Sequence, residues 1–250
     1  MRRVGITLFV VAALMTVAIY FLRQVRFDLL IARAMIGALP SAEAMYPPSP
    51  SDLPACVSTP LPELLVKYEK LLVELGVDVQ SDLQRGLTDG ELDAIEVQYQ
   101  FKLTEDIRQL YKWHNGTPET CGTEVFPWGR FLPIDDSLKI KNLPNTHPDP
   151  EVQKLHAQML AFRQSWIPVI EDASGNGFYF DPDRSTQSSS FFYHAHDDIP
   201  YYFYPCVGNY IQSLIDMHAQ GQLIYNNQSI QVTEPDIVKF VNQYGKFVAE

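Results

Sequence analysis

Residues 86–116 read GLTDGELDAIEVQYQFKLTEDIRQLYKWHNG, and this stretch contains the clearest helix start signal of the chain. Its first helix begins at Thr88, because Thr88 and Glu91 have the spacing of a capping box, in which each side chain bonds the backbone of the other residue. Apolar residues then recur at helical spacing, which predicts the buried stripe of that helix: Leu92, Ile95 and Tyr99.

A second helix follows from Thr104, which is a good N-cap residue. Glu105 and Asp106 occupy the first turn, where the helix dipole favours anions. Asn115-Gly116 ends the helix, because both residues tolerate a positive φ. Its inner face is predicted to hold Ile107, Leu110, Tyr111 and His114. Upstream, leucines at helical spacing over 62–75, closed by Gly76, predict another helix.

Downstream of residue 165 the apolar period changes from 3.6 to 2, which is typical of strands. The predicted strands are Trp166–Glu171, Gly177–Asp181, Ser190–His194 and Pro200–Tyr204, with a short one near Trp128–Ile134. Further helices are predicted over 151–164, 211–218 and 237–244, and a hairpin over 223–232 that turns at Asn226-Asn227. Helices, then antiparallel strands, then helices indicate an α+β fold, a mostly antiparallel sheet with helices packed against it.

The N-terminus carries one uncharged apolar run, Val4–Leu22. Its 19 residues would reach about 28 Å as a helix, enough to cross the hydrocarbon core of a bilayer. The run ends in bulky residues and then Arg23, which favours an uncleaved anchor over a cleaved signal peptide. We expect a transmembrane signal anchor over 1–26, a juxtamembrane helix and Pro-rich spacer over 27–60, and one domain over 61–250.

Arginines flank the apolar run on both sides, so the sequence leaves the side of the membrane on which the domain lies undetermined. Residues 1–33 hold five arginines against Asp28, and the whole chain has a net charge of −11, so residues 34–250 carry −15. Such a domain repels nucleic acid and attracts a basic partner, although acidic surfaces also serve solubility alone. The expected contacts are therefore an unidentified, basic protein, and the bilayer through residues 4–22.

Three blocks of sequence together resemble the SUKH superfamily of fungal cell-wall regulators and bacterial immunity proteins. They are residues 86–116, the pair Trp166–Ile170 and Gly177–Asp181 around a glycine-rich turn, and Phe191–His194 with the late helix near Tyr210. The resemblance covers about residues 60–245, and the long segment at 117–165 departs from it. It implies a non-catalytic protein-binding module without a cofactor, which acts in toxin immunity or in envelope regulation.

Aromatic residues near the fourth strand are the candidate protein-binding residues, because exposed aromatics often anchor interfaces: Tyr201, Tyr202 and Tyr204, with Phe203 between them. The alternative hypothesis is a metal-dependent enzyme. His194, His196 and Asp198 would share one face of a strand, and two imidazoles with a carboxylate can hold zinc or iron. The competing interpretation is a polar strand end that turns into a loop.

The cysteines give no metal motif, because no CxxC occurs in the chain. Cys121 and Cys206 could form a disulfide in an oxidising compartment, which spacing alone leaves open.

A third hypothesis treats the domain as a tethered envelope scaffold. The sequence therefore predicts a single-pass membrane protein with a binding domain, and leaves its partner open.

Overall fold

A computed structural model describes residues 53–141, 166–182, 191–194, 202–233 and 237–247 of the chain. The predicted anchor, most of the spacer and the predicted helix over 151–164 lie outside these residues. In the part of the chain that the structure describes, no helix is both long and apolar enough to cross a bilayer. The span at residues 4–22 therefore stays a prediction.

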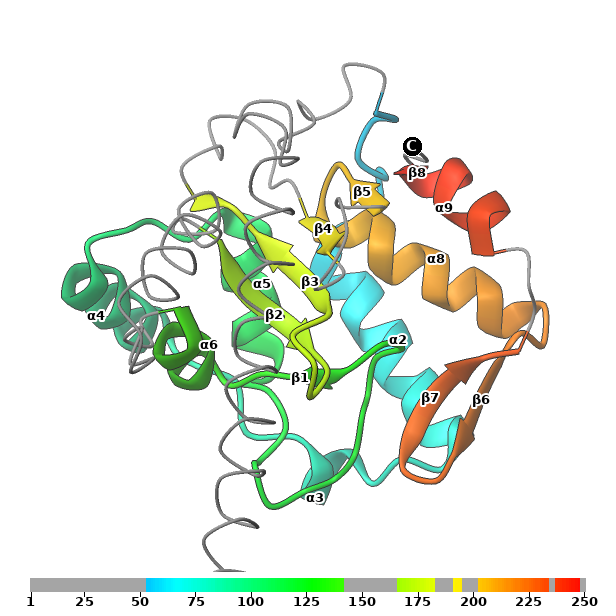
Figure 1. Ribbon diagram of the computed structural model, residues 1–250, viewed down its shortest axis with the longest axis horizontal. Coiled ribbons are helices and arrows are strands. Elements are labelled where there is room, and N and C mark those ends of the chain that lie inside the picture. The colour runs from blue at the N-terminus through cyan, green and yellow to red at the C-terminus, as the bar shows by residue number, and fades with distance from the viewer. Residues whose placement is uncertain (1–52, 142–165, 183–190, 195–201, 234–236, 248–250) are drawn as a thin grey trace, which may run out of the picture. The chain divides into compact units, whose positions relative to one another are not determined.

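The described residues form an α+β domain whose elements are labelled in Figure 1. The helices are α2 (Leu61–Leu75), α3 (Val79–Asp82), α4 (Asp89–Tyr99), α5 (Glu105–Trp113), α6 (Ile134–Lys141), α8 (Val207–Ala219) and α9 (Ile237–Tyr244). The strands are β1 (Arg130–Phe131), β2 (Ile167–Glu171), β3 (Gly177–Phe180), β4 (Phe191–His194), β5 (Tyr202–Tyr204), β6 (Leu223–Asn226), β7 (Ser229–Val232) and β8 (Lys246–Phe247).

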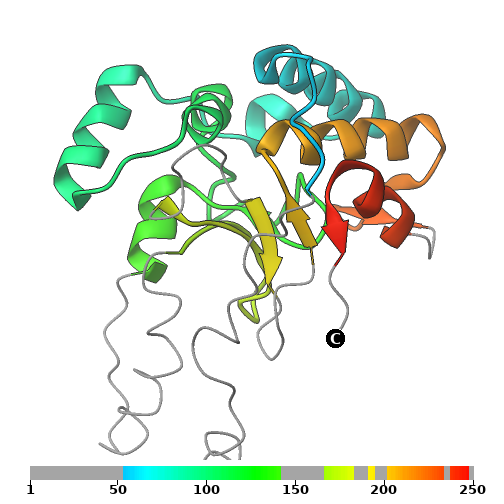
Figure 2. The ribbon, with the colours of Figure 1, turned by 90° about the horizontal axis from the view of Figure 1, so that it is seen from above.

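Six of these strands form one antiparallel sheet in the order β1-β2-β3-β4-β5-β8, and β6 and β7 form a separate hairpin. Helices α2, α5 and α8 contact one another and lie on one face of the six-stranded sheet (Figures 1 and 2). The predicted antiparallel α+β fold is confirmed. The sequence prediction contains neither strand β8 nor helices α3 and α6.

Aromatic rings of the sheet form the contact with α8. Tyr210 of α8 lies with its ring centroid 4.5 Å from that of Phe178, 5.3 Å from Phe191 and 5.4 Å from Tyr204. All four side chains are at most 1% exposed. Burying aromatic rings of this size contributes on the order of 2 kcal/mol each, so this contact is a main source of stability.

Two buried tyrosine hydroxyls in this core differ in their partners. Tyr68 of α2 stacks on Phe126, and its hydroxyl donates to the carbonyl oxygen of Val125 at 2.6 Å. The hydroxyl of Tyr210 is buried and has no hydrogen-bond partner among the described residues. Burial raises the pKa of both tyrosines well above the ordinary value, so both rings stay neutral.

Two element boundaries differ from the sequence prediction. The strand expected near Trp128–Ile134 is reduced to β1, because Pro133 supplies no amide for pairing and α6 starts at Ile134 with two acidic residues in its first turn. The hairpin turn consists of Asn227 and Gln228, with φ of 50° and 64°, rather than Asn226-Asn227. Asn tolerates this left-handed region better than β-branched residues do.

The disulfide differs from the pairing that the sequence left open. Cys206 is bonded to Cys56, with the Cα atoms 6.0 Å apart, and Cys121 is a free thiol next to Asp82 and Thr123. Cys121 therefore does not pair with Cys206 in this structure. Cys56 is the partner because the segment ahead of α2 lies beside the first turn of α8.

Polar contacts reinforce this junction at the start of α8. The buried side chain of Asn209 accepts from the Val57 amide and donates to the carbonyl oxygens of Ala55 and Tyr244, at 2.8, 3.2 and 2.7 Å. Asp106 of α5 accepts from the Val207 amide, which replaces the side-chain cap that α8 lacks. The end of the spacer, α5, α8 and α9 are thus joined at one point.

The two tyrosines give a matched test of the core. Tyr68→Phe should lower the free energy of unfolding by about 1–2 kcal/mol, because the Val125 carbonyl loses its donor. Tyr210→Phe should leave stability unchanged or raise it, because the hydroxyl it removes has no described partner. Urea unfolding of the purified chain measures both, and a larger loss for Tyr210→Phe than for Tyr68→Phe would contradict the assignment.

Candidate protein-binding surface

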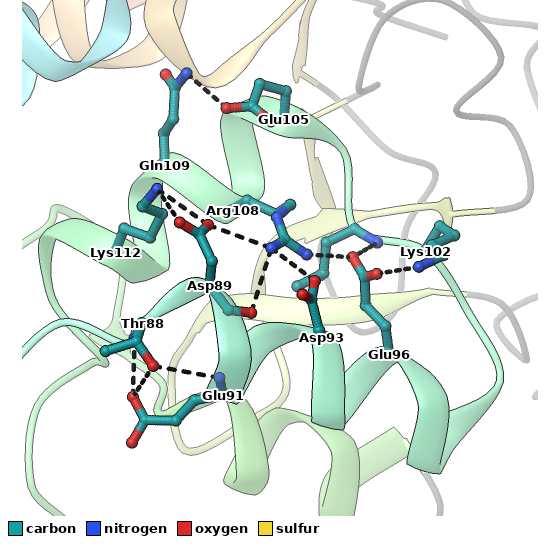
Figure 3. Close-up of polar contacts among 11 residues, drawn as sticks. Thr88, Asp89, Glu91, Asp93, Glu96, Lys102, Glu105, Arg108, Gln109 and Lys112 are labelled. Atoms are coloured by element: carbon teal, nitrogen blue, oxygen red, sulfur yellow. Dashed lines mark hydrogen bonds and ion pairs between the residues drawn. The ribbon is translucent and has the colours of Figure 1, made fainter.

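The turn into α4 is held by the predicted capping box, drawn in Figure 3. The Glu91 amide donates to the Thr88 hydroxyl at 3.3 Å, and the Thr88 amide donates to the Glu91 carboxylate at 2.8 Å. Arg85 also binds this carboxylate. Hydrogen bonds from Arg85 and then from Thr88 lower the pKa of Glu91 to about 2. The capping box is confirmed, and its carboxylate stays ionised at any physiological pH.

A buried glutamate joins α4 to α5. Glu96 is 3% exposed, and its carboxylate accepts from the Leu103 amide at 3.0 Å, from Arg108 at 2.9 Å and from Lys102. Burial alone would raise the pKa of Glu96, but the hydrogen bonds from Lys102, Leu103 and Arg108 outweigh it and lower the pKa. Glu96 is therefore an ionised anchor for the loop between the two helices (Figure 3).

The cations of α5 also bind exposed carboxylates of α4. Arg108 contacts Asp93 at 2.9 Å and Asp89 at 3.3 Å, and Lys112 contacts Asp89 at 3.0 Å. The Arg108 side chain is 15% exposed, whereas those of Asp89 and Asp93 are 64% exposed. The α5 cations thus fix the position of carboxylates that face solvent. We call the exposed part of Asp89, Asp93 and Val97 the α4 face.

Val97 makes the α4 face unusual, because it is 76% exposed, more than any other large apolar side chain that the structure describes. An exposed apolar residue beside fixed carboxylates has the composition of a small recognition surface, with an apolar centre and a polar rim. Neither Val97 nor Glu96 is among the site residues that the sequence predicts. A signal existed for Glu96, since it lies four residues after the buried Leu92 and therefore on the inner side of the helix.

Two glycines let the backbone approach closely on either side of this helix pair. A Cβ on Gly86 would lie 1.8 Å from the carbonyl oxygen of Lys112. A Cβ on Gly116 would lie 2.3 Å from the Pro133 nitrogen, and Gly116 has a φ of 75°. Trp113 and His114, which lie between the two glycines in the sequence, are held by contacts inside the domain. His114 Nδ1 lies 2.8 Å from the Gln84 carbonyl oxygen, and Trp113 donates to Glu69 at 2.7 Å.

The predicted binding aromatics are placed differently from the expectation. Tyr204 is 1% exposed and Phe203 is 4% exposed, so the prediction that these two rings lie on the surface is wrong. Tyr204 faces α8 and Phe203 packs on Phe192, because a run of aromatics on an inner strand fills both faces of the sheet. Tyr201 lies outside the described residues, and Tyr202 belongs to β5, so their role in binding stays a prediction.

The candidate metal triad is described only at His194. This side chain is 2% exposed on β4, with ring contacts to Trp166 at 5.4 Å and Tyr179 at 6.0 Å. His196 and Asp198 lie outside the described residues. In the ranges that the structure describes, no three His, Cys, Asp or Glu side chains are grouped as a metal site would require. The metal hypothesis gains no support from His194, whose ring packs among aromatics.

The described residues thus define an α+β domain with a six-stranded antiparallel sheet and aromatic rings in its core. At its surface, ion pairs hold helix α4 against helix α5. Residues 86–213, just over half of the chain, match the model of the SMI1 / KNR4 family (SUKH-1), and the chain belongs to this family. The resemblance seen in the sequence is confirmed. A comparison with curated proteins finds no match for the chain.

The matched residues begin at Gly86 and include α4, α5, the large sheet up to β5 and the first half of α8. Cys56, α2, the β6–β7 hairpin and α9 lie outside the match. The α4 face is therefore part of the family's own unit, whereas the disulfide joins that unit to a preceding segment. Family membership suggests an immunity or cell-wall regulatory module.

The helix pair can be tested by removing one cation at a time. Arg108→Ala should lower the free energy of unfolding by about 3 kcal/mol, because it removes an ion pair from the buried Glu96. Lys102→Ala should cost less than about 1 kcal/mol, because the Lys102 side chain is 79% exposed and water replaces it. Equal losses for the two variants, measured by urea unfolding, would show that Arg108 does not hold the pair together.

Proposed function

We propose that this chain is a non-catalytic protein-binding module that is anchored in a membrane by residues 4–22. Its partner is a basic protein, and the role is toxin immunity or regulation of the envelope. The observation that carries the proposal is membership in the SMI1 / KNR4 family. The charge of −15 on residues 34–250 supports a basic partner, because opposite potentials speed encounter and favour the matching surface.

The α4 face is the part of the domain that we propose for the partner. Its carboxylates on Asp89 and Asp93 are exposed and already oriented by α5, so binding needs little ordering of these side chains. Val97 offers an apolar contact beside them. A basic side chain of the partner would compete with Lys112, which is itself 42% exposed, for Asp89.

The disulfide supports one side of the membrane for the domain. Disulfides persist in oxidising compartments and are rare where thiols are kept reduced. Cys56 lies at the end of the predicted spacer, so its bond to Cys206 would fasten the membrane-proximal chain to the domain. We therefore propose that the domain lies on the oxidising, non-cytoplasmic face of the membrane.

Partner binding is tested with two exposed valines. The tagged full chain is recovered from its source cells in mild detergent, and co-purifying proteins are quantified as the salt concentration rises. Val97→Arg should reduce recovery of the partner at least about tenfold, because it places a like charge against a basic surface in the contact. Val73→Arg is the matched control and should leave recovery unchanged, because Val73 lies on a different helix, α2, and is itself 60% exposed.

Salt should release the partner, because screening weakens attraction between exposed charges. If recovery is the same for both arginine variants, the α4 face is not the binding surface. If no protein is recovered at low salt by the unaltered chain, the binding function itself fails.

The compartment is tested by counting reactive thiols. A membrane fraction of the source cells is denatured without reductant and treated with a maleimide that adds mass. We expect one modification per chain, at Cys121, and three after reduction, because Cys56 and Cys206 are bonded. The Cys121→Ser control should give none before reduction and two after it. Three modifications without reduction would place the domain in a reducing compartment.

A further inference from the structure

The β6–β7 hairpin differs in charge from the rest of the domain. Residues 222–233 read QLIYNNQSIQVT and contain no charged residue, proline or glycine. The chain around them carries a net charge of −15 over residues 34–250. Edge strands of soluble proteins are normally protected by charges, prolines or bulges, because an open edge pairs with other chains. This hairpin has none of these sequence protections.

The open edge belongs to β6. On the other side of the hairpin, β7 is bonded to Glu124: the Glu124 amide donates to the Gln228 carbonyl at 2.7 Å, and the Ile230 amide donates to the Glu124 carbonyl at 3.1 Å. Strand β6 has β7 as its sole neighbour among the described strands, and in Figure 1 it forms the outer strand of the hairpin. Within the described ranges, the outer edge of β6 is therefore available for another strand.

The register of the hairpin shows which backbone groups point outward. The Thr233 amide donates to the Gln222 carbonyl at 2.9 Å, and Ile224 lies opposite Gln231. Antiparallel pairs alternate between bonded and non-bonded, so Gln222, Ile224 and Asn226 direct their backbone groups toward β7. The amide and carbonyl of Leu223 and of Tyr225 then point away from the hairpin.

The side chain at the centre of this edge is apolar and exposed. Ile224 is 40% exposed. Among the described residues, the other exposed large aliphatic side chains lie on helices, and Ile224 lies on a strand. Leu223, which precedes it, is 3% exposed and points into the core. The edge thus offers two outward backbone pairs with one exposed isoleucine midway between them.

We propose that the outer edge of β6 pairs antiparallel with β6 of a second copy of this chain, about a two-fold axis at Ile224. In this register Leu223 faces Tyr225 of the second copy, and Ile224 faces Ile224. Both outward residues of each strand then exchange backbone hydrogen bonds, and the two hairpins become one four-stranded sheet. A two-fold contact of this kind uses the same surface on both copies and closes without forming a filament.

Charge favours a second copy at this place. Two domains of charge −15 repel each other over most of their surfaces, so a stable contact between copies needs a surface without like charges. Residues 222–233 provide one. A strand from a basic partner would not be attracted to this uncharged edge, because its electrostatic attraction depends on nearby acidic residues. This contact is independent of the α4 face and of the proposed partner.

The contact is tested by cross-linking the full chain in detergent with copper phenanthroline. Ile224→Cys should form a disulfide-linked dimer at least about tenfold faster than Gln231→Cys, because Cα atoms of a central non-bonded pair lie about 4.5 Å apart, within disulfide range. Gln231 lies opposite Ile224 on the inner strand, so its two copies would be about 14 Å apart, three strand spacings. Both variants keep Cys121, which sets the common background.

Sedimentation of the unaltered chain gives a second measurement that needs no substitution at the edge. The dimer fraction should rise with salt, because screening weakens repulsion between the acidic domains. Amide exchange at Leu223 and Tyr225 should slow as the chain concentration rises. Equal cross-linking of the two cysteine variants, or a chain that stays monomeric with unprotected amides at every salt concentration, would overturn the proposal. Cross-linking of Ile224→Cys to a different protein would assign the edge to that protein instead.

Discussion

The packing of Tyr210 against the sheet is the contact on which the rest of the domain depends. Its ring meets rings from three neighbouring strands, β3, β4 and β5, so it holds α8 across the middle of the sheet. Once α8 is placed, α2 and α5 pack beside it and complete the helical layer. The side chains are large and rigid, so they bury much area for a small loss of rotamer freedom.

The placement of α8 also determines where the spacer enters the domain. Asn209 and Cys206, at the first turn of this helix, hold the chain at Ala55 to Val57 through hydrogen bonds and the disulfide. Asp106 connects the same turn to α5 and so to the helix pair that carries the α4 face. A tether fixed in this way would present the surface of the domain in a defined orientation to a partner.

Two surfaces of the domain differ in their physical character. The α4 face combines fixed carboxylates with Val97, and we propose it for a partner of opposite charge. The outer edge of β6 has no charged side chain and offers outward backbone hydrogen-bonding groups. We propose it for pairing between identical chains, because it brings no like charges together. Attraction between opposite charges favours the α4 contact, whereas repulsion between two acidic domains opposes the β6 contact. Salt screens both effects, so it should weaken the first contact and strengthen the second. The two contacts can therefore exist on one molecule without competing.

The amino-acid sequence was enough to predict the capped helix that begins at Thr88, the antiparallel strands, the hairpin and the family. These features depend on residues close in the chain, where spacing is directly visible. It could not show that Cys206 pairs with Cys56 across 150 residues or that Tyr204 is buried. Each of these depends on which distant segments meet in space, and a pattern of neighbouring residues carries no information on that. Both follow from the packing of the folded chain, because burial and disulfide pairing are properties of packed elements.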